Sequence, residues 1–77
     1  MEKQIVRKGE VYDSDCIECV DNELFEKCVF FDCSFQGLAG NFFECIFHHK
    51  DQVIFNILNL NITYCAFFAF EDKFKAK

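Results

Sequence analysis

Large apolar side chains recur every five residues along most of this chain, and this period constrains the fold more than any other feature. In the clearest units a cysteine stands two positions before a phenylalanine: Cys28 and Phe30, Cys33 and Phe35, Cys45 and Phe47, Cys65 and Phe67. A helix repeats its apolar stripe every 3.6 residues and a half-buried strand alternates every two. Neither explains a period of five, so the chain is expected to fold as a structural repeat.

The repeat falls into two frames, with a slip of two residues at 37–39. The first frame is centred on Val20, Phe25, Phe30 and Phe35. The second is centred on Phe42, Phe47, Ile57, Ile62 and Phe67, with a missed unit at Gln52, and Gly40, Cys45, Phe55, Leu60 and Cys65 stand two positions earlier. Two inward side chains in every five residues predict a solenoid in which each unit forms one side and one corner. Backbone hydrogen bonds would join successive coils at about 4.8 Å.

This pattern resembles the pentapeptide-repeat family, in which a central Leu or Phe and a small residue two positions before it point inwards. The resemblance implies a mainly all-β fold, a short right-handed quadrilateral β-helix of two to three coils. We expect a single domain over 1–77, with an N-terminal cap at 1–15, coils at 16–69 and a short helical cap at 70–77. Phe70 and Phe74 would share one face of that helix. His48 to Gln52 breaks the repeat and predicts a protruding loop.

Acidic residues dominate the first half of the repeat. The chain has a net charge of -5 and a pI of about 4.8, which makes free nucleic acid and membranes poor direct partners. Nine acids stand against one base, Lys27, in one stretch: Glu10, Asp13, Asp15, Glu18, Asp21, Glu23, Glu26, Asp32 and Glu44. Glu18 and Glu23 fall at inward positions of the first frame, and because burying unpaired charge is costly, we expect an irregular coil that turns both outward.

Stacked coils are expected to arrange these carboxylates in rows along a rigid rod, much as duplex DNA arranges its phosphates. The resemblance adds a function, because pentapeptide-repeat proteins include DNA mimics. In size, repeat and charge the chain is similar to small phage-encoded anti-CRISPR inhibitors, including one of this fold directed against a type I-C effector. We therefore expect a non-enzymatic, monomeric inhibitor in the bacterial cytoplasm. Its nine acids would bind the DNA- or PAM-reading surface of a CRISPR effector such as type I Cascade.

Other interpretations stay open at this point. The acids could serve solubility alone, and a gyrase inhibitor of the same family would need dimerisation to reach the required length. A scaffold module could instead use aromatic side chains that fall outside the inward positions, namely Phe31, Phe43, Tyr64 and Phe68. Binding through acids should weaken with salt, whereas aromatic packing should not.

Zinc binding and thiol catalysis are the chemical alternatives. Cys16 and Cys19 have ligand spacing, and His48 and His49 follow Cys45 closely. The repeat already explains four of the six cysteines as small inward residues, and two remaining ligands do not close a zinc site. Buried thiols are unreactive because burial raises their pKa. A bacterial cytoplasm keeps such cysteines reduced, and we expect no metal, cofactor or catalytic residue.

Overall fold

The computed structural model describes residues 3–50 and 53–68, and this part of the chain is an all-β solenoid of about three coils. The strands are β1 (Ile5–Lys8), β2 (Val11–Asp13), β3 (Cys16–Cys19), β4 (Glu23–Glu26), β5 (Val29–Phe31), β6 (Ser34–Phe43), β7 (Ile46–His48), β8 (Ile54–Thr63) and β9 (Ala66–Phe68). The solenoid predicted from the five-residue period is confirmed. The helical cap predicted at 70–77 lies outside the described residues. Among the described residues, no helix is long and apolar enough to cross a membrane.

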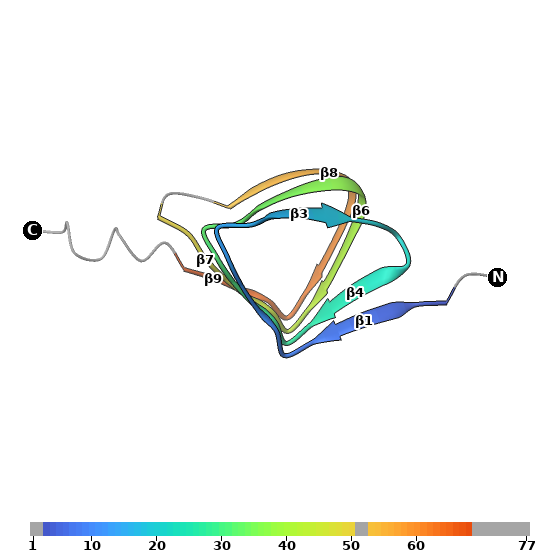
Figure 1. Ribbon diagram of the computed structural model, residues 1–77, viewed down its shortest axis with the longest axis horizontal. Coiled ribbons are helices and arrows are strands. Elements are labelled where there is room, and N and C mark those ends of the chain that lie inside the picture. Colours follow the sequence, from blue (N-terminus) through green and yellow to red (C-terminus); the bar gives the residue numbers. More distant parts are fainter. Residues whose placement is uncertain (1–2, 51–52, 69–77) are drawn as a thin grey trace, which may run out of the picture.

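Viewed along its axis, the coil has three sides (Figure 1). One side is the stack β2-β5-β7-β9. The long strands β6 and β8 each turn a corner, so that their first halves pair beside β3 and their second halves beside β4 and β1. The coils differ in length. Arg7 aligns with Phe25 and Phe25 with Phe42, so the first two coils span 18 and 17 residues, whereas Phe35 aligns with Phe55 and the third coil spans 20.

Many of the described units combine strand alternation with a left-handed corner residue. In β5, Val29 and Phe31 point outward while Phe30 is buried, and the buried Cys28 precedes the strand. Asp32 then turns the corner with φ of 54° and still donates its N–H to the carbonyl of His48 at 2.8 Å. The other left-handed corners are Gly9, Ser14, Lys27, Glu44 and Tyr64. This geometry accounts for the period: two inward residues, two outward residues and one corner.

Phenylalanine rings fill the solenoid in columns that run along its axis. The predicted core residues Phe25, Phe30, Phe35, Phe42 and Phe47 are each at most 3% exposed. One column runs Tyr12–Phe30–Phe47–Phe67, with ring centroids 5.1, 5.0 and 4.8 Å apart and nearly parallel planes. Rings from different columns meet edge to face across the interior. Such edge contacts add to the area they bury, so the small core is held by both packing modes. Phe67, in the last described coil, is 48% exposed.

Two predicted frame positions are wrong. Val20 is 41% exposed, and Ile17 takes the inward place, aligned with Phe35. Phe55 was expected two residues before a centre. It instead aligns with Phe35 and stacks on it as a member of a ring column, with centroids 5.0 Å apart. The reason is that coils differ in length, so a frame carried five residues at a time loses its register at each turn.

The slip predicted at 37–39 is the bend inside β6. Gly37 has φ of 139°, a conformation that a side chain would strain. A Cβ added there would lie 2.1 Å from the carbonyl oxygen of Cys19 on the neighbouring strand. Glycine therefore allows the strand to turn the corner while it remains paired.

The loop predicted from His48 begins later than expected. His48 is the last residue of β7, and its ring stacks between Phe31 and Phe68 at 4.9 and 5.1 Å. An aromatic ring at this outward position continues the ladder of its neighbours, which keeps His48 in the strand. Residues 51–52 of the expected loop lie outside the described part.

The corner geometry makes a prediction with opposite signs at two sites. Lys27 has φ of 55°, where an L-residue costs about 1–2 kcal/mol and glycine does not. Lys27→Gly is expected to leave the free energy of unfolding unchanged or raise it by up to about 1 kcal/mol. Leu24→Gly, in the extended strand β4, should lower it by about 0.5–1 kcal/mol or more. Urea unfolding followed by circular dichroism measures both, and an equal loss in the two variants would contradict the corner assignment.

Candidate interaction surface

The acids do not form the rows expected along the solenoid. Among the strand pairs of the described residues, Asp13 aligns with Phe31, Glu18 with Gln36, and Glu26 with Lys8 and Phe43. No acid in these pairs has an acid as its neighbour. Like charges on adjacent strands destabilise a sheet, so strict register opposes the arrangement that the sequence suggested.

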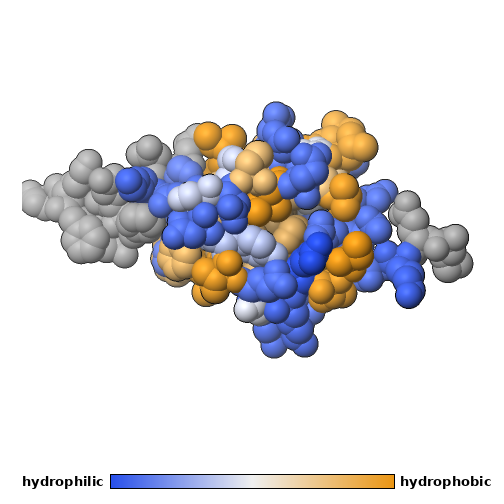
Figure 2. Space-filling model, in the orientation of Figure 1, coloured by the Kyte–Doolittle hydropathy of each residue, from blue (hydrophilic) through white to orange (hydrophobic). Residues whose placement is uncertain are grey.

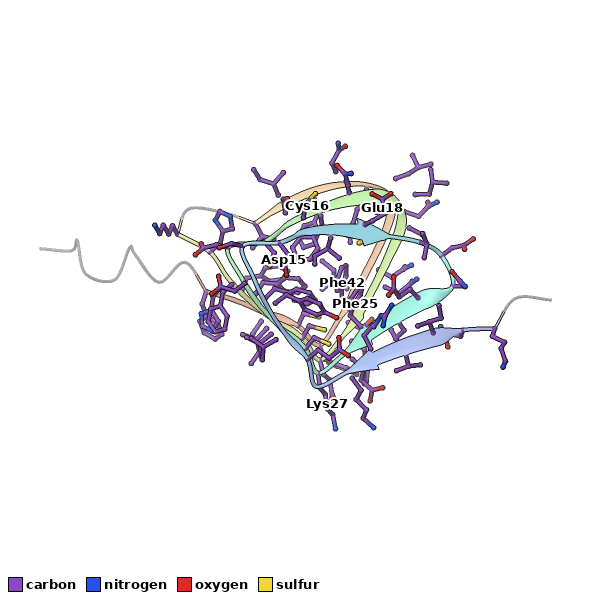
Figure 3. All side chains as sticks on the ribbon, viewed as in Figure 1. Asp15, Cys16, Glu18, Phe25, Lys27 and Phe42 are labelled. Atoms are coloured by element: carbon purple, nitrogen blue, oxygen red, sulfur yellow. The ribbon has the colours of Figure 1, made fainter. Side chains whose placement is uncertain are left out.

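Carboxylates instead surround one coil. Residues 10–26 contain seven acids and no base, and they run through β2, β3 and β4 on three successive sides. Five of these acids are exposed and form what we call the acidic girdle: Glu10, Asp13, Asp15, Glu18 and Asp21. Figure 3 labels Asp15 and Glu18 on this coil, with Lys27 at the opposite corner. The negative charge is therefore concentrated at the N-terminal end of the solenoid.

Two acids in the described part of the later coils, Asp32 and Glu44, have local partners. Asp32 accepts a hydrogen bond from the backbone N–H of Lys50 at 3.0 Å. Glu44 lies 3.9 Å from the ammonium of Lys27, in an exposed pair. Exposed pairs of this kind contribute little to stability. Girdle acids also accept hydrogen bonds, Glu10 from Tyr12 and Glu18 from Gln36, but the girdle has no base in its own stretch.

Glu23 is buried, contrary to the expectation that it turns outward. Its carboxylate accepts a hydrogen bond from Arg7 Nε at 2.6 Å, and its side chain is 11% exposed. Arg7 aligns with the inward Phe25 and reaches Glu23 across one coil, while its own side chain stays 45% exposed at the open end. The ion pair also raises the pKa of Arg7, first through the hydrogen bond and then through the charge of Glu23. Glu18 is exposed, as expected.

The N-terminal end of the solenoid is an open hollow of about 410 Å³ with mixed walls. Tyr12 stacks on Phe30 and donates its hydroxyl hydrogen to Glu10. Burial, and then this hydrogen bond, raise the pKa of Tyr12. Figure 2 looks onto this end and shows hydrophobic groups separated by hydrophilic ones around the rim. At this water-exposed end of the columns, polar groups thus stand where the later coils have Phe and Cys.

The outer face of the β2-β5-β7-β9 sheet is largely apolar. Two outward columns cross it, Val11–Val29–Ile46–Ala66 and Asp13–Phe31–His48–Phe68. Figure 3 shows these two rows of side chains projecting from that side. Two further aromatic residues that were predicted to be outward, Phe43 and Tyr64, touch edge to face at the adjacent corner, with centroids 5.9 Å apart.

The cysteines divide into one exposed and five sheltered thiols. Strand alternation points Cys16 outward and buries Cys19, so the two do not converge as the sequence spacing suggested. Burial raises the pKa of Cys19 and of Cys45 to about 11 and raises the pKa values of Cys28 and Cys33 as well. Their Sγ atoms approach backbone carbonyls, as Cys45 does to Phe25 at 3.2 Å. Within 3–50 and 53–68, no three His, Cys, Asp or Glu side chains gather as metal ligands would.

Comparison with models of protein families, with curated proteins and with solved structures finds no significant match to this chain.

The Arg7–Glu23 pair predicts a specific loss of stability. Arg7→Met keeps the aliphatic stem but leaves the buried carboxylate of Glu23 without its partner, which should lower the free energy of unfolding. Lys8→Met removes the same charge from the next residue, which is exposed, and should change stability by less than about 0.5 kcal/mol. Equal effects in urea unfolding would show that Glu23 does not depend on Arg7.

The thiols predict both selective labelling and alkaline sensitivity. N-ethylmaleimide at pH 8 should modify Cys16 first, and peptide mass spectrometry would locate the label. Folding raises the pKa of Cys19 and of Cys45 from 9 to about 11, and the stabilisation linked to this shift is fully present below pH 9. That contribution should decline as the pH rises from 9 towards 11. Even labelling of all six cysteines in the native protein would contradict the burial described.

Proposed function

We propose that this protein is a non-enzymatic inhibitor that places its acidic end in the DNA-binding surface of another protein and so blocks recognition of duplex. The observation that carries the proposal is the girdle: five exposed acids on one coil, with no base between residues 10 and 26. A basic groove attracts such an end as it attracts phosphates, which favours rapid association that salt weakens.

The target class that we propose is a CRISPR effector complex of type I, whose duplex- or PAM-reading surface is basic. The girdle acids are the proposed contact residues, with Asp32, Glu44 and Glu26 outside the main contact. Charge concentrated on one coil favours end-on insertion over lying lengthwise in a groove, because the described part of the later coils carries fewer exposed acids. The proposal therefore differs from a duplex mimic with phosphate-like rows.

A gel-shift assay with a purified type I effector complex and its target duplex tests this function. The protein should prevent the duplex from shifting, and inhibition should fall as salt rises. Replacing three girdle acids (Asp13→Asn, Asp15→Asn, Glu18→Gln) should weaken inhibition about tenfold or more, since three contacts at roughly 0.5 kcal/mol each are lost.

The matched control removes the same charge elsewhere, at Glu26→Gln, Asp32→Asn and Glu44→Gln. This variant should inhibit within about threefold of the natural protein, if the girdle is the contact. Circular dichroism would confirm that both variants fold. Equal inhibition by the two triple variants would reject the girdle, and no inhibition by the natural protein would reject the proposed target.

A second candidate function is a scaffold module that binds through exposed aromatics. The stacked column Phe31–His48–Phe68 favours it, because three rings aligned on a sheet surface form a ready contact area. Binding through this column would resist salt and would not be displaced by duplex DNA.

A further inference from the structure

The outer face of the β2-β5-β7-β9 sheet differs from the outer surface of the other two sides. On those sides the outward positions mix scattered exposed apolar residues, such as Leu38, Ile54 and Leu58, with hydrogen-bonded polar groups. Gln36 donates to Glu18 at 3.0 Å, and Asn61 donates to Asn41 at 3.0 Å. Strands β5 and β7 instead read Val-Phe-Phe and Ile-Phe-His, apolar or aromatic at every position. Strands with apolar residues on both faces are typical of a sheet covered on both sides.

Exposure along this face is lowest on the central strands β5 and β7 and higher at both edges. Val29, Phe31 and His48 are half-buried, while Val11 is 65% exposed and Phe68 44% exposed. Stacking within the columns shields the ring faces and leaves ring edges and aliphatic groups in contact with water. The face is thus already ordered by the fold, so a partner would meet it without a large loss of side-chain freedom.

Acids border the apolar face at its first strand. Asp13 begins the aromatic column on β2, Glu10 precedes that strand, and Asp15 follows it. These are girdle residues, so the acidic end and the apolar face adjoin each other. An apolar centre beside a charged margin is the usual composition of a protein–protein contact.

We infer that this face, with the girdle acids at its edge, docks a protein surface that has an apolar patch bordered by Lys or Arg. The inference rests on the proposed function, in that it gives the same partner a second, apolar contact. Charge selects this occupant over a second copy of the chain. Two copies packed face to face in parallel would bring Asp13 against Asp13, and antiparallel packing would bury Asp13 against Phe68. The two columns contain no Lys or Arg, so neither arrangement pairs Asp13 with a base of the facing columns. An unpaired buried carboxylate is costly.

Two synthetic peptides of the same leucine and lysine composition test the inference. In one, helix formation aligns the leucines in a stripe flanked by lysines. In the other, the same residues are scrambled so that no stripe forms. Each peptide is titrated into isotopically labelled protein, and the amide NMR resonances are followed. The striped peptide should shift the amide resonances of β5 and β7 at physiological salt. The scrambled peptide should shift only the amide resonances of the girdle residues, and only at low salt.

Matched variants locate the apolar contact. Val29→Thr with Ile46→Thr keeps β-branched side chains in the strands and should weaken binding of the striped peptide about three- to tenfold, since apolar contact area is lost. Leu38→Thr with Leu58→Thr changes residues that are 72% and 75% exposed at another corner and should leave binding unchanged.

The outcomes separate this inference from the proposed function. Shifts confined to the girdle with both peptides would overturn the inference and leave the acidic contact standing. Concentration-dependent dimers with shifts in β5 and β7 would assign the face to a second copy and would also overturn it. Salt-resistant binding through β5 and β7 together with failure of the gel-shift assay would support the docking face and reject the proposed target. Binding of neither peptide would count against both surfaces.

Discussion

Stacking of similar side chains in strict register is the constraint on which the rest of this structure depends. Parallel pairing holds successive coils at the strand spacing of about 4.8 Å, and that distance lets aromatic rings lie face to face. The column from Tyr12 to Phe67 follows this rule with centroids 4.8–5.1 Å apart. Backbone hydrogen bonds and ring stacking therefore favour the same register, and a slip would weaken both.

The same rule explains the surface. A column that stabilises Phe31, His48 and Phe68 when they repeat would destabilise carboxylates that repeat, because each would face its own charge at one strand spacing. Acids can accumulate only sideways, around a coil. The girdle is this solution, and the hydrogen bond from Gln36 to Glu18 shows how the next coil accommodates an acid above it.

The five-residue period was enough to predict the core of the middle coils, because Phe30, Phe35 and Phe47 lie in uninterrupted units. It failed where the coil length changes. Tyr12, Ile17 and Arg7 each precede their aligned partners Phe30, Phe35 and Phe25 by 18 residues, and this common offset was the signal that could have placed the first coil. Glu23 was misplaced for the same reason, since its partner Arg7 is 16 residues away and is found only once the coil length is known. The sequences of β5 and β7 indicate an apolar outer face, but only the register shows that those strands lie side by side.

Charge at the first coil performs two roles at once. A solenoid with apolar inward residues at both ends would invite copies to stack end to end, and charged groups turned inward at an edge oppose such association. Arg7 and Glu23 pair at inward positions at this end, and Glu10 lines the open hollow there, where water lowers the cost of charge. The carboxylates that protect this edge thus also make it acidic. An end coil is also where substitutions disturb the fewest neighbours, since each coil contacts only the next. A recognition surface can consequently change at the first coil while the stacked rings of the middle coils keep the fold.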